Sequence, residues 1–297
     1  MEKFNTQALP HRGARYIFVI LLLALLGACS SLKLAYNNGD TLLFWWLDAY
    51  VDLTSDQKPG VKSDIGDLFR WHRKTQLQDY VQILHAGQRQ LQGTPSVAEL
   101  QADYREARTR AETVLMKAVP DIAELALKLT PAQIAAMETK FDKNNRDFRR
   151  KNMKGDRTEQ MKFRYKKSME QFELWFGDFS REQEAAIRKA SDARPLDNEL
   201  WLDERMRRQQ RILELARKIQ QERPAQAVAE GWIREVIREL FDRMDKPSDR
   251  KAFFDAYLAG NVEFVHTVIG LTTPQQKEHA HKRIQGWIDD LHALALK

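Results

Sequence analysis

Cysteine is nearly absent from this chain, which has a single cysteine, Cys29, among 297 residues. Without a second thiol the chain cannot close a disulfide within itself or build a zinc site from several cysteines. Glycine-rich phosphate loops and Gly-x-Ser-x-Gly turns are also missing, and none of the seven histidines stands in a His-Glu-x-x-His pair. We therefore expect no catalytic residue, no metal site and no cofactor. A cell-wall hydrolase that uses one glutamate among many remains a minor alternative.

Long apolar runs are missing too. The longest one, residues 16–26, has 11 residues, whereas a membrane-spanning helix needs about 20. Lys3, Arg12 and Arg15 precede this run, and Gly27 and Ala28 follow it. A basic segment, a short apolar segment and small residues in this order are typical of a secretory signal peptide, which we assign to residues 1–28.

The end of this segment, Leu26-Gly27-Ala28-Cys29, resembles the lipobox of bacterial lipoproteins. The resemblance implies that the Cys29 sulfur receives a diacylglycerol, that the chain is cut before Cys29 and that the new N-terminus is acylated with palmitate-type chains. Ser30 in place of aspartate is similar to lipoproteins sorted to the outer membrane. The expected location is therefore the periplasmic face of the outer membrane, with residues 29–40 as a tether.

Strand patterns and hairpin turns are likewise lacking, and glycine is scarce, with 13 residues in the chain. After residue 40, apolar residues recur at helical spacing through long charged segments. The sequence predicts an all-α fold over residues 41–297, an elongated bundle of about nine or ten helices in antiparallel hairpins. If the bundle has two helical subdomains, we expect them to meet near residues 178–196.

Four stretches repeat an apolar residue, a hydroxyl residue and, three positions after the hydroxyl, a glutamine. They are Leu53, Thr54 and Gln57; Leu129, Thr130 and Gln133; Phe179, Ser180 and Gln183; and Leu271, Thr272 and Gln275. This spacing is typical of a capping box, in which the hydroxyl caps the new helix and the glutamine bonds back to the cap residue. Ordinary helix starts would explain the repeats.

The pattern Leu-Thr-x-x-Gln also resembles small helical periplasmic stress proteins of the Spy type. That resemblance implies an ATP-independent chaperone with a basic, curved surface for unfolded client proteins. The lipobox together with residues 34–57, LAYNNGDTLLFWWLDAYVDLTSDQ, resembles a family of uncharacterised Gram-negative lipoproteins, from which no activity follows.

Positive charge is concentrated between residues 140 and 167, where twelve basic residues face four acids. The candidate anion- or client-binding residues are Lys143, Arg146, Arg149, Arg150, Lys151, Lys154, Arg157, Lys162, Arg164, Lys166 and Lys167. Residues 152–156 read as the turn of a helical hairpin whose tip would carry these charges. The hairpin is either a solubilising surface, a site for envelope phosphates or carboxylates, or a client surface. Nucleic acid is not an expected partner at this location.

Phe44, Trp45 and Trp46 follow the tether closely. An aromatic plug in the bundle core is the favoured interpretation, since neighbouring leucines also need burial; a helix resting on the membrane is the alternative. As a whole, the sequence favours a non-catalytic binding role, chaperone-like or in envelope maintenance. A structural adaptor between the outer membrane and peptidoglycan or a partner complex is the alternative.

Overall fold

The computed structural model describes residues 31–242, residue 248 and residues 250–296. The predicted signal peptide, the lipobox residues Leu26, Gly27 and Ala28, and Cys29 lie outside the described residues. The described residues form thirteen α-helices and no strand, which confirms the all-α prediction and exceeds the predicted number of helices. The helices are α2 (Ser31–Asn37), α3 (Gly39–Val51), α4 (Gln57–Thr75), α5 (Leu77–Leu91), α6 (Val97–Lys117), α7 (Val119–Leu127), α8 (Pro131–Asn152), α9 (Arg157–Phe176), α10 (Arg181–Ala193), α11 (Asn198–Glu222), α12 (Gln226–Asp242), α13 (Lys251–Leu271) and α14 (Pro274–Ala295).

The additional helices arise at short breaks that sequence periodicity does not register. The apolar pattern running from Ile65 to Leu84 predicts one helix, yet the chain ends α4 at Thr75 and restarts α5 at Leu77. At this break the Thr75 hydroxyl bonds to the Trp71 carbonyl oxygen at 2.8 Å. Both sides of the break keep the same helical period, so a count based on period merges the two helices.

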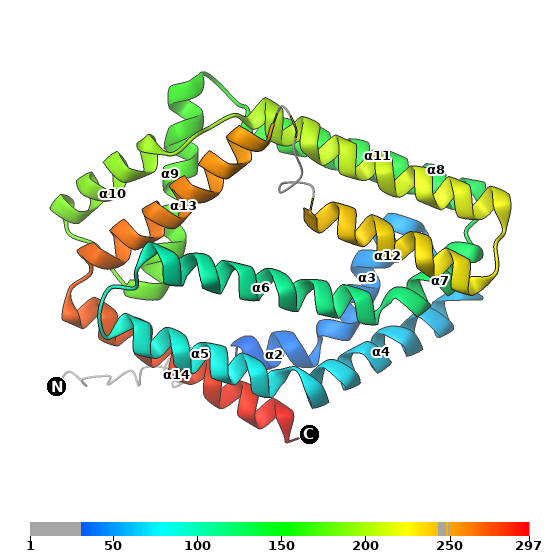
Figure 1. The fold of residues 1–297 in the computed structure, drawn as a ribbon, viewed down its shortest axis with the longest axis horizontal. Coiled ribbons are helices and arrows are strands. Elements are labelled where there is room, and N and C mark those ends of the chain that lie inside the picture. The colour runs from blue at the N-terminus through cyan, green and yellow to red at the C-terminus, as the bar shows by residue number, and fades with distance from the viewer. Residues whose placement is uncertain (1–30, 243–247, 249, 297) are drawn as a thin grey trace, which may run out of the picture.

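The helices gather at two ends of the molecule (Figure 1). At one end α3, α4, α7, α8, α11 and α12 enclose two apolar clusters, one around Phe44 and Ile134 and the other around Ala123 and Ile233. At the other end α9, α10, α13 and α14 enclose a cluster around Ile187 and Phe264. A fourth cluster joins α5 to α14. Helix α6 contacts both α12 and α13 and so links the two ends.

Four helix-to-helix connections meet in two pairs, and each pair is joined by two glutamine side chains. At the first crossing, Gln133 Nε2 donates to Gln57 Oε1 at 2.7 Å and Gln57 Nε2 donates to Gln133 Oε1 at 3.3 Å. At the second crossing, Gln183 Nε2 donates to Gln276 Oε1 at 2.8 Å and Gln276 Nε2 donates to Gln183 Oε1 at 3.2 Å. Gln57, Gln133 and Gln183, three of the four predicted motif glutamines, thus also join connections that are far apart in sequence.

Each glutamine also donates to a backbone carbonyl of the opposite connection. Gln133 bonds to the Asp52 oxygen at 3.2 Å, and Gln57 bonds to the Lys128 oxygen at 3.1 Å. The second crossing repeats the arrangement, with 2.7 Å from Gln276 to the Asp178 oxygen and 2.7 Å from Gln183 to the Leu271 oxygen. These bonds satisfy carbonyl groups that the ends of helices leave without an intrahelical partner.

The capping prediction needs two corrections. Thr130 with Gln133 and Ser180 with Gln183 form complete capping boxes at the starts of α8 and α10. The prediction for the fourth motif, with Thr272 and Gln275, is wrong by one residue, because Thr273 and Gln276 form the box. The Thr272 hydroxyl instead bonds to the Ile269 carbonyl at 2.6 Å, at the end of α13.

The first motif is only half a capping box. Gln57 Oε1 accepts the Thr54 backbone N–H at 3.0 Å. Helix α4 begins at Gln57 itself, however, and its N-cap residue, Asp56, makes no side-chain cap. The prediction that the Thr54 hydroxyl caps this helix is therefore wrong.

The predicted aromatic plug is also only partly present. Phe44 is 6% exposed and lies in the core, whereas Trp45 and Trp46 are 61% and 56% exposed. The favoured interpretation is wrong for the two tryptophans, because the face of α3 that packs on α4 and α8 is filled by Phe44, Leu43 and Leu47.

Candidate functional site

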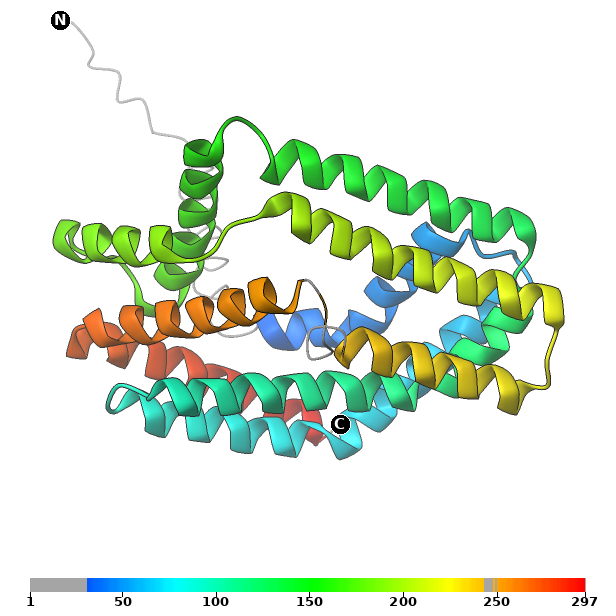
Figure 2. The same ribbon diagram turned by 45° about the horizontal axis from the view of Figure 1, so that its top comes forward.

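The predicted basic hairpin does not form. Helix α8 runs beside α11, whereas α9 turns away and packs against α10 and α14 (Figure 2). Buried Asn145 of α8 exchanges hydrogen bonds with Gln209 of α11 at 2.7 and 3.1 Å, which favours this pairing. Between α8 and α9 the chain turns through Gly155 at a φ of +71°, a conformation that favours glycine. The basic residues therefore do not gather at one tip. They lie along α8, α9 and the turn between these two diverging helices, which we call the corner.

Ten of the eleven candidate basic residues are exposed on this corner, namely Lys143, Arg146, Arg149, Arg150, Lys151, Lys154, Arg157, Lys162, Lys166 and Lys167. Some have partners on the surface, such as Arg150 with Asp147 at 2.9 Å and Lys167 with Glu170 at 2.7 Å. Arg164 differs because it is half-buried and points its guanidinium at the connection after α10. Its burial distinguishes Arg164 from the exposed basic surface, so we centre the candidate site on this residue.

Arg164 binds the end of α10 through backbone carbonyl groups. Its Nη1 donates to the Pro195 oxygen at 2.7 Å, and its Nη2 donates to the Ser191 oxygen at 2.8 Å and the Arg194 oxygen at 3.2 Å. Its buried Nε has no hydrogen-bond partner. Since the C-terminal end of a helix carries partial negative charge, α10 compensates part of the Arg164 charge.

A second arginine lies beside it, and sequence reasoning missed it. Arg194 is 8% exposed, with its guanidinium 3.9 Å from the centre of the Phe264 ring. It donates to the Ser191 hydroxyl at 2.9 Å, the Ser168 hydroxyl at 3.2 Å and Asn261 Oδ1 at 2.9 Å. Its position just before Pro195, outside the charged run, gives no sign that it joins Arg164.

The two arginines form a concentration of positive charge. Burial, together with the charge of Arg164, lowers the pKa of Arg194 to about 10, and burial also lowers the pKa of Arg164. Both side chains therefore stay protonated at neutral pH. Neither forms an ion pair with any described residue, and the acid whose charge acts on both, Asp192, is paired with Arg188 at 2.7 Å.

Both arginines line a cleft of about 510 Å³ between α9, α11 and α13. Aromatic rings and amide groups form the remaining walls, among them Phe172, Trp201, Tyr257, Asn198 and Asn261. Trp201 Nε1 is buried and has no hydrogen-bond partner. The cleft thus combines two cationic side chains with apolar and amide walls, and two of its lining residues, Arg164 and Trp201, each hold a buried N–H without an acceptor. This arrangement is suited to an anion that carries an apolar part.

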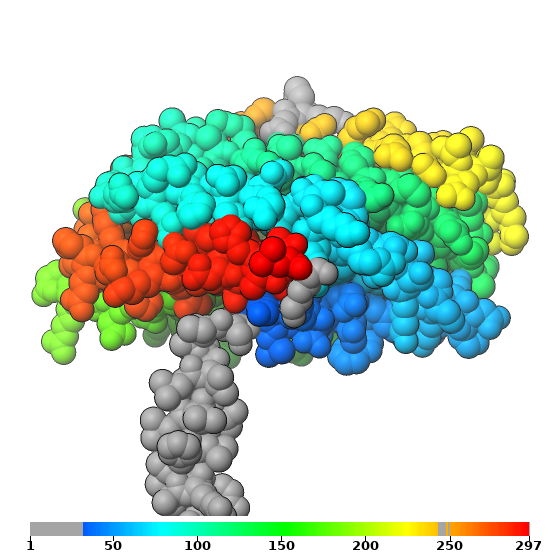
Figure 3. Space-filling view, turned by 90° about the horizontal axis from the view of Figure 1, so that it is seen from below, coloured from blue at the N-terminus to red at the C-terminus, as the bar shows by residue number. Residues whose placement is uncertain are grey.

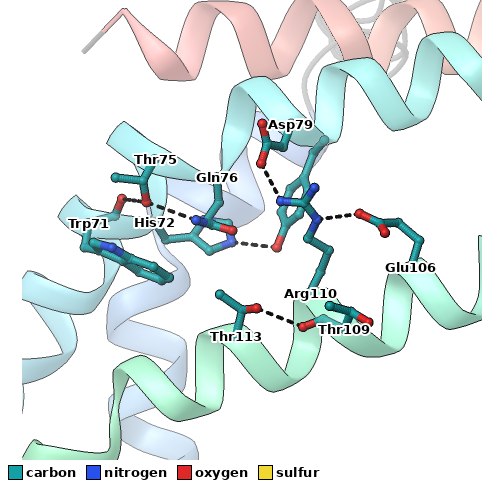
Figure 4. A network of polar contacts seen from close by, with 10 residues as sticks. Trp71, His72, Thr75, Gln76, Asp79, Glu106, Thr109, Arg110 and Thr113 are labelled. Carbon is teal, nitrogen blue, oxygen red and sulfur yellow. Dashed lines mark hydrogen bonds and ion pairs between the residues drawn. The ribbon is translucent and has the colours of Figure 1, made fainter.

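A separate polar network connects α2, α4, α5 and α6. His72 is half-buried, with Nδ1 2.9 Å from the Tyr36 hydroxyl and Nε2 3.1 Å from the Tyr80 hydroxyl. Arg110 of α6 is hydrogen-bonded to Asp79, and its Nε donates to Glu106 Oε1 at 2.7 Å (Figure 4). Burial lowers the pKa of His72 and raises the pKa values of Tyr36 and Tyr80, so the imidazole is neutral at pH 7. This network positions helices, and within the described residues no group of three or more His, Cys, Asp or Glu could hold a metal ion.

A comparison with protein families gives a match. The model of a family of unknown function, DUF6279, matches residues 49–228. The chain belongs to DUF6279. The matched residues include Arg164, Arg194 and Trp201, whereas the α13 wall of the cleft lies beyond the matched residues of DUF6279. No curated protein and no solved structure matches the chain.

Proposed function

We propose that this protein is a lipid-anchored component of the bacterial cell envelope that binds anionic ligands without transforming them. The anchor would be Cys29, and the domain would face the periplasm from the outer membrane. The lipobox-like segment from Leu26 to Cys29 and the preceding apolar run support the anchor.

The binding role rests on one observation, the adjacent Arg164 and Arg194 in a cleft with no ion-pair partner among the described residues. An anion in the cleft would gain charge-assisted hydrogen bonds, which are about twice as strong as neutral ones. Arg164 Nε and Trp201 Nε1, on two residues that line the cleft, are buried N–H donors without a partner, and we expect such a ligand to accept hydrogen bonds from them. The aromatic walls favour a ligand with an apolar part beside its charge.

The ligand class that fits is a phosphate-bearing amphiphile of the envelope. A volume of about 510 Å³ admits a headgroup and the beginning of its chains, or one unit of a phosphorylated polymer. Lys167 lines the same cleft and is exposed, so it can reach a phosphate at the opening.

The test measures binding of dihexanoyl phosphatidic acid to residues 30–297, which retain every described helix. We expect binding that inorganic phosphate weakens, and no binding of the zwitterionic dihexanoyl phosphatidylcholine. Trp201→Phe keeps an aromatic side chain, although a smaller one, and removes the N–H donor, so binding weakens by roughly two- to tenfold, the effect of one hydrogen bond.

The matched control reverses charge on the exposed basic surface, with Arg149, Arg150 and Lys151 all changed to Glu. These residues do not line the cleft, and screening at physiological salt limits their effect to about one Debye length, roughly 8 Å. We expect little change in affinity for phosphatidic acid. Loss of binding in the triple variant with no loss in Trp201→Phe would assign binding to the general basic surface and refute the cleft.

A second candidate function, capture of unfolded acidic clients, is supported by the exposed corner itself. Arg149 lies 4.0 Å from the sulfur of Met206, which is 42% exposed, so charge and adaptable apolar surface are adjacent there. Under this function the triple variant, and not Trp201→Phe, loses the ability to suppress light scattering by an aggregating client. The same two variants therefore separate the two functions.

A further inference from the structure

Helix α3 carries an apolar stripe on its exposed side. Leu42, Trp45, Trp46 and Ala49 are all exposed, and Leu42 and Ala49 each lie three or four residues from the two tryptophans, so the four residues share one face of the helix. Leu42 is 51% exposed, less than the two tryptophans. Phe44 and Val51 are the buried residues of α3, so this helix is apolar on its buried and its exposed sides. Such a helix is typical of burial or of contact with lipid.

The stripe is concentrated, unlike the other exposed apolar residues. Of the eleven large apolar side chains exposed in the described residues, four are Leu34, Leu42, Trp45 and Trp46, within thirteen positions. The others are dispersed over helices and the C-terminal end, as single exposed apolar residues normally are. An apolar group of this kind indicates an interaction surface.

The position of the stripe indicates what covers it. Leu34 follows Cys29 by five residues, and the apolar run 16–26 precedes Cys29. Helices α2 and α3 lie together along one edge of the molecule, on the opposite side from α12 (Figure 3). If Cys29 carries a lipid, the bilayer surface is therefore within a few residues of α2 and α3.

Two lysines lie against aromatic rings of α3. Lys62 is exposed, with its Nζ 4.7 Å from the centre of the Phe44 ring, and Lys140 Nζ lies 5.4 Å from that of the Tyr50 ring. Tyr50 in turn packs against Trp46, with the two ring centres 4.7 Å apart and the rings tilted by 46°. Tryptophan and tyrosine favour the bilayer interface, and lysine beside them favours anionic headgroups. Within the described residues no helix is long and apolar enough to cross a membrane.

We propose that the α3 stripe, Leu42, Trp45, Trp46 and Ala49, lies in the interfacial layer of the bilayer as a second membrane contact. The inference rests on the lipid attachment at Cys29 proposed above. An interfacial helix buries its apolar face about 5–10 Å into the headgroup boundary. With a lipid at Cys29 and a helix lying flat, the domain would be held in one orientation.

The test uses the full-length, processed protein in vesicles of phosphatidylethanolamine with a minority of phosphatidylglycerol. In the variant Trp45→Cys the new cysteine is the only free thiol, because Cys29 would be acylated, and it receives a nitroxide spin label. The measurement is the collision rate of the label with oxygen, which enters lipid, and with a water-soluble nickel chelate. The matched control is Val228→Cys on α12, whose native side chain is 45% exposed.

We expect the label at position 45 to be reached by oxygen several-fold more than by the chelate, and the label at 228 to show the reverse. Equal accessibility at both positions in a protein whose mass includes the lipid would overturn the inference and leave the anchor intact. Spin–spin broadening at 45 alone would also overturn it, since a second copy would then cover the stripe. A missing lipid mass with a second label at Cys29 would refute the anchor, and the inference with it.

Discussion

The two glutamine-joined crossings are alike in their hydrogen bonds and differ in their caps. At the second crossing both connections, before α10 and before α14, carry complete capping boxes. At the first crossing only the connection before α8 carries one, because Thr54 lies too far ahead of α4 to cap it. The amide pair persists without the hydroxyl cap, so the cross-connection bonds are the common element of the two crossings.

The surroundings of the crossings differ more than the crossings themselves. The first crossing follows α3 and lies at the end of the molecule that carries the exposed tryptophans. The second belongs to the end whose helices α9 and α13 border the arginine cleft. Similar glutamine crossings therefore occur near two surfaces of different chemistry, one apolar and one cationic.

The largest expected effect comes from removing one glutamine of a pair. Gln133→Ala and Gln276→Ala each leave a backbone carbonyl, a partner amide and a backbone N–H without their bonds. We expect each to lower the free energy of unfolding by about 2–4 kcal/mol, measured by urea denaturation. The two losses agree within about 1 kcal/mol if the crossings are equivalent.

A matched control for each is the change to glutamate. Gln133→Glu keeps the oxygen that accepts the Thr130 N–H and removes the Nε2 donor to Asp52 and Gln57. A loss close to that of the alanine variant would assign the stability to the cross-connection bonds. If glutamate is as stable as glutamine, the cap alone matters and the comparison of the crossings fails.

A smaller effect distinguishes the hydroxyl residues. Thr130→Ala, Ser180→Ala and Thr273→Ala each remove an N-cap acceptor and cost about 1 kcal/mol. Thr54→Ala leaves the free energy of unfolding unchanged, because the hydrogen bonds of Thr54 are made by its backbone N–H and carbonyl groups, which alanine keeps. An equal loss at Thr54 would show that its hydroxyl caps α4 in solution.

The smallest effect is a local response to pH at one end only. Burial holds the pKa of His72 below its usual value of 6.5. As the pH falls, the imidazole is therefore protonated in the unfolded chain at a higher pH than in the folded chain. The contribution of neutral His72 to the free energy of unfolding is fully present above pH 6.5 and is lost as the pH falls from 6.5 to the lowered pKa. The slope of this loss stays below the one-proton limit of about 1.4 kcal/mol per pH unit.

We expect hydrogen exchange to accelerate over this range in α2, α4 and α5, after correction for the intrinsic pH dependence of exchange. Helices α10 and α13 serve as the internal reference. His72→Gln removes the added acceleration. A uniform change at both ends, or one that persists in His72→Gln, would contradict the assignment to His72.

The sequence predicts the helices well, because apolar spacing and capping boxes are local. The sequence does not determine the register of the fourth motif, because both Thr272 and Thr273 stand three residues before a glutamine. The side-chain pairing cannot be predicted from local pattern at all. The partners are 76 residues apart at the first crossing and 93 at the second.

The candidate site was predictable only in part. The density of charge indicated the α8–α9 segment and hence Arg164, but not its burial, which depends on how α9 packs against α10. Arg194 stands alone in sequence and joins Arg164 only through tertiary structure. The same reason applies to Trp45 and Trp46. Their apolar character predicts burial, but tertiary packing determines which face of α3 is buried, and the two tryptophans lie on the exposed face.

The reciprocal amide bonds also bear on how this chain can evolve. Each glutamine both donates to its partner and accepts from it, so replacing one of them leaves the other with an unpaired amide, and a second replacement on the distant helix can relieve this defect. The two positions of a crossing should therefore drift together. Across DUF6279, coupled change at positions 57 and 133 would be a record of this joint that survives after the surrounding residues have diverged.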